Sequence, residues 1–96
     1  MYKLIIVDDE KAIRNGIKEY FDWTSMNLEV VALFEDGKEA ISYIQHNEVD
    51  VVLTDIEMAE VSGLEFARYI HENVLPQKVV IISGYKEFEY ARQAVQ

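Results

Sequence analysis

The sequence has no cysteine, a single proline and only four glycines among its 96 residues. Without cysteine the chain has no disulfide, no thiolate metal ligand and no thiol nucleophile. So little glycine and proline leaves no flexible linker, and the length is that of one small domain, residues 1–96. No apolar run reaches the ~18 residues of a membrane span, and the first residues show no signal-peptide pattern. We therefore expect one cytoplasmic domain with no membrane partner.

Basic residues are also scarce. The chain has 9 lysines and arginines but 18 aspartates and glutamates, so its net charge is −9. This balance argues against the chain itself holding nucleic acid through its phosphates. A solvated acidic surface accounts for much of the charge. Half of the residues are hydrophobic, so a core is still possible.

Apolar runs alternate with amphipathic segments along the chain. Four runs have the length and β-branched content of buried strands: 3–7, 29–34, 49–54 and 78–82. Four segments carry apolar residues at helical spacing: 11–21, one that follows Asp36, one that opens at Ser62 or Gly63, and 87–95. Strands and helices in alternation predict right-handed crossovers and an α/β fold with a doubly wound parallel sheet.

The helical spacing also predicts which side chains face the core. The expected inward residues are Ile13, Ile17, Tyr20 and Phe21 in the first segment, Ala40, Ile41 and Ile44 in the second, and Leu64, Ala67, Ile70 and Val74, with Phe66 beside them, in the third. Asp36 is expected to cap the second helix. Trp23 is expected to pack against the end of the first.

Acidic residues stand where two of the apolar runs end. Asp55 follows 49–54, and Asp8 and Asp9 follow 3–7. The carboxyl ends of parallel strands meet at one edge of the sheet, where ligands of open α/β sheets bind, so the three carboxylates converge if the two strands are neighbours. Ser83 ends the fourth run at the same edge. A lone Asp would more simply cap a loop, but this much negative charge in one place needs a cation.

Oxygen ligands suit a hard cation, and Mg²⁺ is the intracellular default. Beside such a cation Asp55 can act as a nucleophile toward phosphorus and form an aspartyl phosphate. The metal would offset the repulsion between phosphoryl oxygens and carboxylates. The hydroxyl of Ser83 can donate a hydrogen bond to a phosphoryl oxygen.

Four stretches together resemble the receiver domain of two-component response regulators: IIVDDE (5–10), LTDIEM (53–58), SGLE (62–65) and ISGY (82–85). The resemblance implies the flavodoxin-like receiver fold, with Asp55 as phosphoacceptor. It implies that Asp9 binds Mg²⁺ directly, Asp8 through water and Glu57 through its backbone carbonyl, and that Ser83 is the switch hydroxyl. Such a domain takes phosphate from a sensor histidine kinase and changes its surface, so it is not an enzyme in the ordinary sense.

Two further stretches, DW (22–23) and SGYKEFEYA (83–91), resemble a narrower group. In that group the receiver precedes an AraC-type helix-turn-helix output domain, which implies transcription regulation and DNA binding through a domain outside these residues. Ala59 stands where the family usually has proline. The family's lysine and aromatic switch residue lie on a fifth strand, roughly twenty residues past Ser83 as the motif spacing runs. We therefore expect a receiver lacking its last β-α unit, with an open sheet edge that favours self-association.

Two other functions compete with this interpretation. A Mg²⁺-dependent phosphohydrolase of the haloacid dehalogenase type would use Asp8 as its nucleophile. Those enzymes need Asp-x-Asp-x-Thr, and here Glu10 and Ala12 occupy the third and fifth positions. A phosphate-independent interaction module with a vestigial pocket is the third possibility, against which the set Asp8, Asp9, Asp55 and Ser83 weighs.

Overall fold

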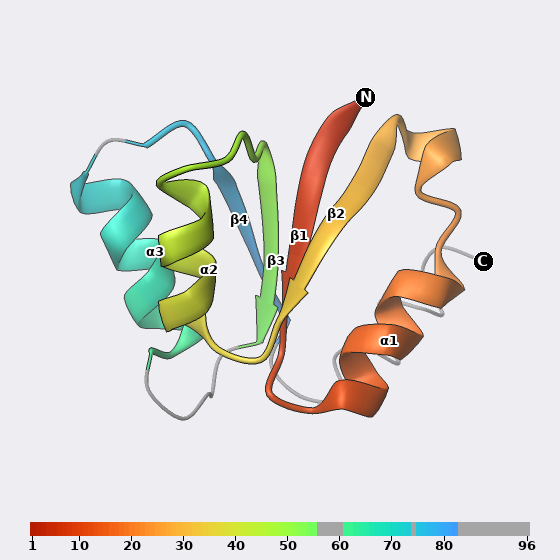
Figure 1. The fold of residues 1–96 in the computed structure, drawn as a ribbon, viewed down its shortest axis with the longest axis horizontal. Helices are drawn as coiled ribbons and strands as arrows, with labels where there is room; N and C mark the ends of the chain where they lie inside the picture. Colours follow the sequence, from red (N-terminus) through yellow and green to blue (C-terminus); the bar gives the residue numbers. More distant parts are fainter. Residues whose placement is uncertain (56–60, 74, 83–96) are drawn as a thin grey trace.

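A computed structural model describes residues 1–55, 61–73 and 75–82 (Figure 1). The elements in chain order are β1 (Tyr2–Val7), α1 (Lys11–Tyr20), the 3₁₀ helix η1 (Thr24–Met26), β2 (Leu28–Phe34), α2 (Gly37–Ile44), β3 (Val51–Asp55), α3 (Gly63–Glu72) and β4 (Lys78–Ile82). The strands form one parallel sheet in the order β2-β1-β3-β4. The predicted α/β class and parallel sheet are confirmed, although β3 begins at Val51 and includes Asp55.

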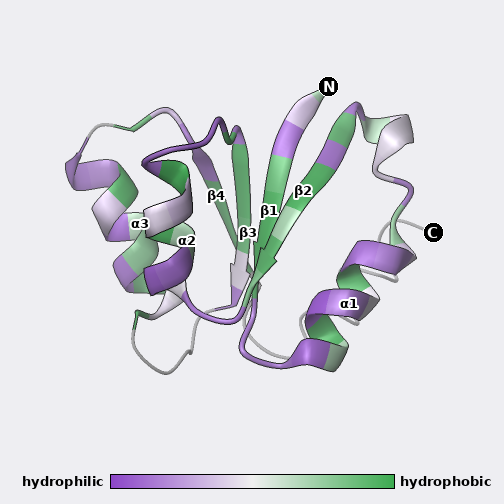
Figure 2. Cartoon of the chain, in the orientation of Figure 1, coloured by the Kyte–Doolittle hydropathy of each residue, from purple (hydrophilic) through white to green (hydrophobic). Residues whose placement is uncertain are grey.

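Helices cover both faces of the sheet (Figure 1). One face carries α1, and the other carries α2 and α3. In β1 the side chains alternate between these faces, with Ile5 and Val7 toward α2 and α3 and Leu4 and Ile6 toward α1. This explains why β1 is apolar along most of its length, as Figure 2 shows by its green colour.

The core under α2 and α3 is built around Phe66, which is fully buried beside Ile70. The expectation that Leu64 faces inward was wrong, because its side chain is 55% exposed. Two residues are just over half a helical turn, so Leu64 points away from the sheet when Phe66 points toward it. Val74 lies outside the described residues.

The core under α1 contains Ile17, with Ile13 and Phe21 packed against it. Tyr20 was also expected inward but is exposed at the end of the helix. Trp23 packs against this cluster and donates its indole N–H to the carbonyl of Lys18 at 2.9 Å. This confirms that Trp23 closes the end of α1.

Both helices on the other face begin at side-chain caps. The Asp36 carboxylate accepts the N–H of Lys38 at 2.9 Å, as predicted for the second helix. Ser62 accepts the N–H of Glu65 at 3.1 Å, and its hydroxyl contacts the Glu65 carboxylate at 3.3 Å. None of the helices in the described ranges is long and apolar enough to cross a lipid bilayer.

Candidate metal centre

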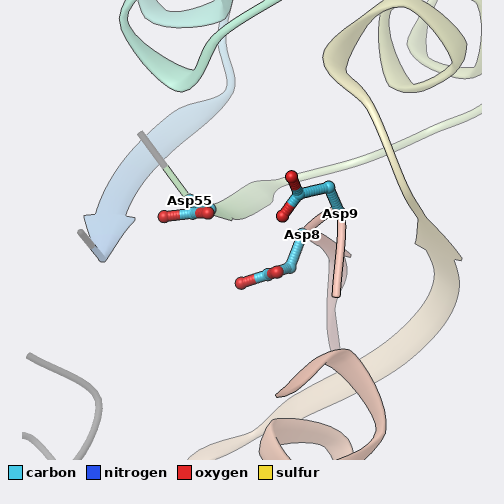
Figure 3. Close-up of side chains that lie close together, drawn as sticks. All are labelled: Asp8, Asp9 and Asp55. Atoms are coloured by element: carbon cyan, nitrogen blue, oxygen red, sulfur yellow. The ribbon is translucent and has the colours of Figure 1, made fainter. Parts of the chain in front are cut away.

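The three predicted acidic residues meet at the carboxyl edge of the sheet. Strands β1 and β3 are neighbours, and their register pairs Val7 with Thr54, so Asp8 and Asp55 leave the sheet side by side. One carboxylate oxygen from each of Asp8, Asp9 and Asp55 lies within 4.8 Å of the other two. Figure 3 shows Asp55 at the end of one strand and the two other carboxylates at the end of its neighbour. The predicted convergence is confirmed.

Asp8 is held by three hydrogen bonds, two to its backbone and one to its carboxylate. Its N–H donates to the carbonyl of Phe34 at the end of β2, at 3.0 Å. Its carbonyl accepts a hydrogen bond from the guanidinium of Arg14 in α1, at 2.7 Å. Its carboxylate accepts the N–H of Glu10 at 2.8 Å. The position of this carboxylate is therefore fixed by β2 and α1 as well as by its own strand.

The three carboxylates differ in their access to water. Asp8 is only 7% exposed, Asp55 is half-buried and Asp9 is exposed. Burial raises the pKa of Asp8 from its ordinary 3.8 to about 6. The negative charges of Asp55, Asp9 and Glu10 contribute to this rise, while the hydrogen bond from the Glu10 N–H opposes it. The ionised cluster is therefore unfavourable by itself, and a cation would relieve it.

The donor set fits a hard divalent cation. All three side chains offer carboxylate oxygens, which Mg²⁺ and Ca²⁺ prefer, and none offers the sulfur or imidazole nitrogen that softer metals select. Mg²⁺ keeps several of its waters when few protein ligands are present, so three carboxylates suffice for a site. These residues therefore fit the Mg²⁺ that the sequence predicts.

The predicted site residues Glu57 and Ser83 lie outside the described residues, and so does Ala59. The helix expected at 87–95 lies outside them too. The metal-binding role of Glu57 and the switch role of Ser83 stay predictions.

Two tertiary hydrogen bonds were not predicted from the sequence. Arg14, in the first turn of α1, donates a hydrogen bond to the backbone carbonyl of Asp8, and no pattern in the sequence pointed to this contact. Asp36 was recognised only as a helix cap. Its carboxylate also accepts the N–H of Val61, at 3.0 Å, in the segment that enters α3.

A parallel sheet with clustered carboxylates at its carboxyl edge fits a domain that binds a hard cation there. The family model described as "Response regulator receiver domain" matches residues 4–96, so the chain belongs to this family and is not a classical enzyme. Over its 96 residues, 100% of its length, the chain is 35% identical to the transcriptional regulatory protein HptR of Staphylococcus aureus. It spans little more than a third of that relative, 37% of its length.

Solved structures agree with this assignment. The REC domain of AraT, a response regulator from Geobacillus stearothermophilus, shares 43% identity and a TM-score of 0.79, over 98% of this chain and 73% of that one. A two component transcriptional regulator AraC from Clostridium phytofermentans shares 30% identity and a TM-score of 0.77, over 94% of this chain and 73% of that one. The resemblance to receivers of AraC-type regulators is thereby confirmed.

Proposed function

We propose that the chain is a phosphorylation switch in which Asp55 accepts a phosphoryl group from a sensor histidine kinase, with Mg²⁺ held by Asp8, Asp9, Asp55 and the backbone carbonyl of Glu57. The observation that carries this proposal is the meeting of Asp8, Asp9 and Asp55 within 4.8 Å at the ends of two neighbouring strands. The phosphorylated domain would act in the cytoplasm on a DNA-binding output domain, because HptR is named as a transcriptional regulatory protein.

The choice of Asp55 over Asp8 as nucleophile follows from access and charge. Asp8 is nearly buried, it already accepts the Glu10 N–H, and its pKa is about 6. A nucleophilic carboxylate needs an ionised oxygen that the phosphorus can approach. Asp55 is half-buried at the end of β3, so phosphorus can approach its carboxylate more readily than that of Asp8. The same comparison argues against a hydrolase that would use Asp8.

The phosphoryl transfer from the kinase to Asp55 forms one bond to phosphorus and breaks another. One carboxylate oxygen of Asp55 attacks phosphorus, the phosphorus–nitrogen bond to the kinase histidine breaks, and its electron pair returns to the imidazole. The product is an acyl phosphate on Asp55. Bound Mg²⁺ supplies the positive charge that offsets repulsion between the phosphoryl and carboxylate oxygens. The hydroxyl of Ser83 donates a hydrogen bond to a phosphoryl oxygen, so its position changes when Asp55 is phosphorylated.

The proposal is tested by incubating the full-length protein with acetyl phosphate and Mg²⁺ and measuring its mass. The native protein should gain one phosphoryl group, and Asp55→Asn, which keeps the shape but removes the nucleophile, should gain none. Asp50→Asn is the matched control, since Asp50 lies just before the other end of β3 and binds the Lys3 N–H at 2.8 Å. Undiminished labelling of Asp55→Asn would overturn the assignment. No labelling of the native protein by kinase or acetyl phosphate would favour the phosphate-independent module.

A further inference from the structure

Arg14 connects the first turn of α1 to the end of β1. Its guanidinium donates a hydrogen bond to the backbone carbonyl of Asp8 at 2.7 Å, and its own backbone N–H donates to the carbonyl of Glu10 at 3.0 Å. The second bond is the ordinary bond of an α-helix, whereas the first reaches back six residues to the end of the strand. Arg14 therefore binds the residues on both sides of Asp9.

Asp9 depends on this backbone for its position. Its carboxylate is exposed, and no group in the part of the chain that the structure describes forms a hydrogen bond or ion pair with it. The Asp8 carboxylate, by contrast, accepts the N–H of Glu10 at 2.8 Å. The placement of the Asp9 carboxylate therefore follows from the backbone of residues 8–10, which the two bonds of Arg14 restrain.

The helix α1 begins without a side-chain cap. Such caps start α2 and α3, but Glu10, which precedes α1, forms no capping hydrogen bond with its side chain. Arg14 is half-buried, and a charged donor makes a stronger hydrogen bond than a neutral one. One turn further along, Ile17 packs the helix against the sheet. The bond from Arg14 thus ties the backbone of Asp8 to a helix that is itself fixed.

We propose that Arg14 is a positioning residue for the metal centre, and that its bond to the Asp8 carbonyl holds the Asp8 and Asp9 carboxylates in the arrangement that binds Mg²⁺. The inference rests on the proposed function, because Mg²⁺ is the occupant proposed there. Groups behind the ligands commonly set metal affinity in this way. The carbonyl that Arg14 binds joins the two ligand residues, so the effect needs no intermediate residue.

Charge and position have opposite consequences at Arg14. A guanidinium repels a cation, so removing Arg14 should strengthen Mg²⁺ binding if only its charge acts on the centre. Removing Arg14 should weaken binding if its hydrogen bond positions the ligands. The sign of the change in affinity therefore separates the two roles.

The test is a calorimetric Mg²⁺ titration of the full-length protein, with hydrogen exchange at the Glu10 amide measured without metal. Arg14→Met keeps an unbranched stem but removes the charge and the donor, and it should weaken Mg²⁺ binding about tenfold. Exchange at Glu10 should become faster, because the Asp8 carboxylate that accepts this N–H is held less firmly. Arg14→Lys keeps a donor on a long side chain and should restore the affinity to within about threefold of the native value.

The matched control is Arg68→Met on α3, which removes the same charge from an exposed position on the other face of the sheet (Figure 1). Its Mg²⁺ affinity and its exchange at Glu10 should stay within about twofold of the native values. If Arg14→Met does not fold, Arg14→Gln takes its place, because the glutamine side chain is uncharged and ends well short of the guanidinium.

Mg²⁺ binding by Arg14→Met that is native-like or tighter would overturn the proposal, and so would native-like exchange at Glu10. Equal weakening by Met and Lys at position 14 would also overturn it, because a restored donor would then have no effect. Acetyl phosphate labelling is measured separately. A native protein that binds Mg²⁺ but gains no phosphoryl group would remove the proposed function alone, whereas one that binds no Mg²⁺ would remove both.

Discussion

Asp8 and Asp55 stand side by side because the residues before them, Val7 and Thr54, are register partners in neighbouring parallel strands. The sheet holds their carboxylates together although their charges repel and burial raises the pKa of Asp8 to about 6. The fold tolerates this electrostatic repulsion because β1 is buried on both faces and its end is hydrogen-bonded to β2 and α1. The fold thus maintains an acidic centre that a cation would complete.

The first prediction concerns stability without metal. The folded pKa of Asp8 lies above its ordinary value of 3.8, so its contribution to stability is full below about pH 3.8 and is lost as the pH rises through about 6. Asp8→Asn resembles the neutral carboxyl and should raise the free energy of unfolding at pH 7 by about 1–3 kcal/mol. Urea unfolding at pH 7 and pH 4 measures this gain, which should shrink at the lower pH. A loss of stability at pH 7 would contradict the electrostatic account.

The second prediction concerns the pH dependence of metal binding. Protons and Mg²⁺ compete for Asp8, so affinity should fall as the pH drops from 7.5 to 5.5 through the pKa of about 6. Calorimetric titration at several pH values measures this fall. The Asp8→Asn variant should bind more weakly at pH 7.5 and lose much of the pH dependence. An equally steep pH dependence in that variant would assign it to another group.

The third prediction ranks the ligands. Asp9→Ala should weaken Mg²⁺ binding more than Glu57→Ala does, because Asp9 offers its carboxylate and Glu57 is proposed to offer only its backbone carbonyl. The same calorimetric titration compares the two variants at one pH. The reverse order would overturn the proposed ligand set.

The fourth prediction separates the two apolar residues of α3. Phe66→Ala should lower the free energy of unfolding by about 3–5 kcal/mol, because Phe66 fills the core under α2 and α3. Leu64→Ala on the same helix is the control and should change it by no more than about 0.5 kcal/mol, because its side chain is 55% exposed. Chemical unfolding of both variants makes the comparison. Similar losses would contradict the assigned helix face.

The fifth prediction concerns the sheet edge. Among the described strands, β4 pairs only with β3, and Val80 on it is 48% exposed. An apolar strand with an unpaired edge invites pairing with a second chain, so the 96-residue polypeptide should self-associate at high concentration. Val80→Lys should reduce this association in sedimentation velocity. A monodisperse native monomer at high concentration would count against the prediction.

Most of the fold and the acidic cluster were predictable because apolar strand patterns and helical spacing repeat along the whole sequence. Apolar runs that end in Asp8 and Asp55 indicated both the parallel sheet and the edge where they meet. Leu64 was misplaced because the apolar spacing alone did not fix which face of the helix is inward until the packing of Phe66 was known. The bond from Asp36 to Val61 could not be predicted, since it depends on how two loops approach in space and leaves no local pattern.

The most direct test of the central claim is to identify the carboxylate that carries phosphate. The full-length protein would be phosphorylated with acetyl phosphate and Mg²⁺ and reduced with borohydride, which converts an aspartyl phosphate to homoserine. Peptide mass spectrometry then locates the converted residue. We predict homoserine at position 55 alone, and none when Mg²⁺ is removed by a chelator. Homoserine at position 8 or 9, or labelling that persists in Asp55→Asn, would contradict the assignment of Asp55 as the phosphoacceptor.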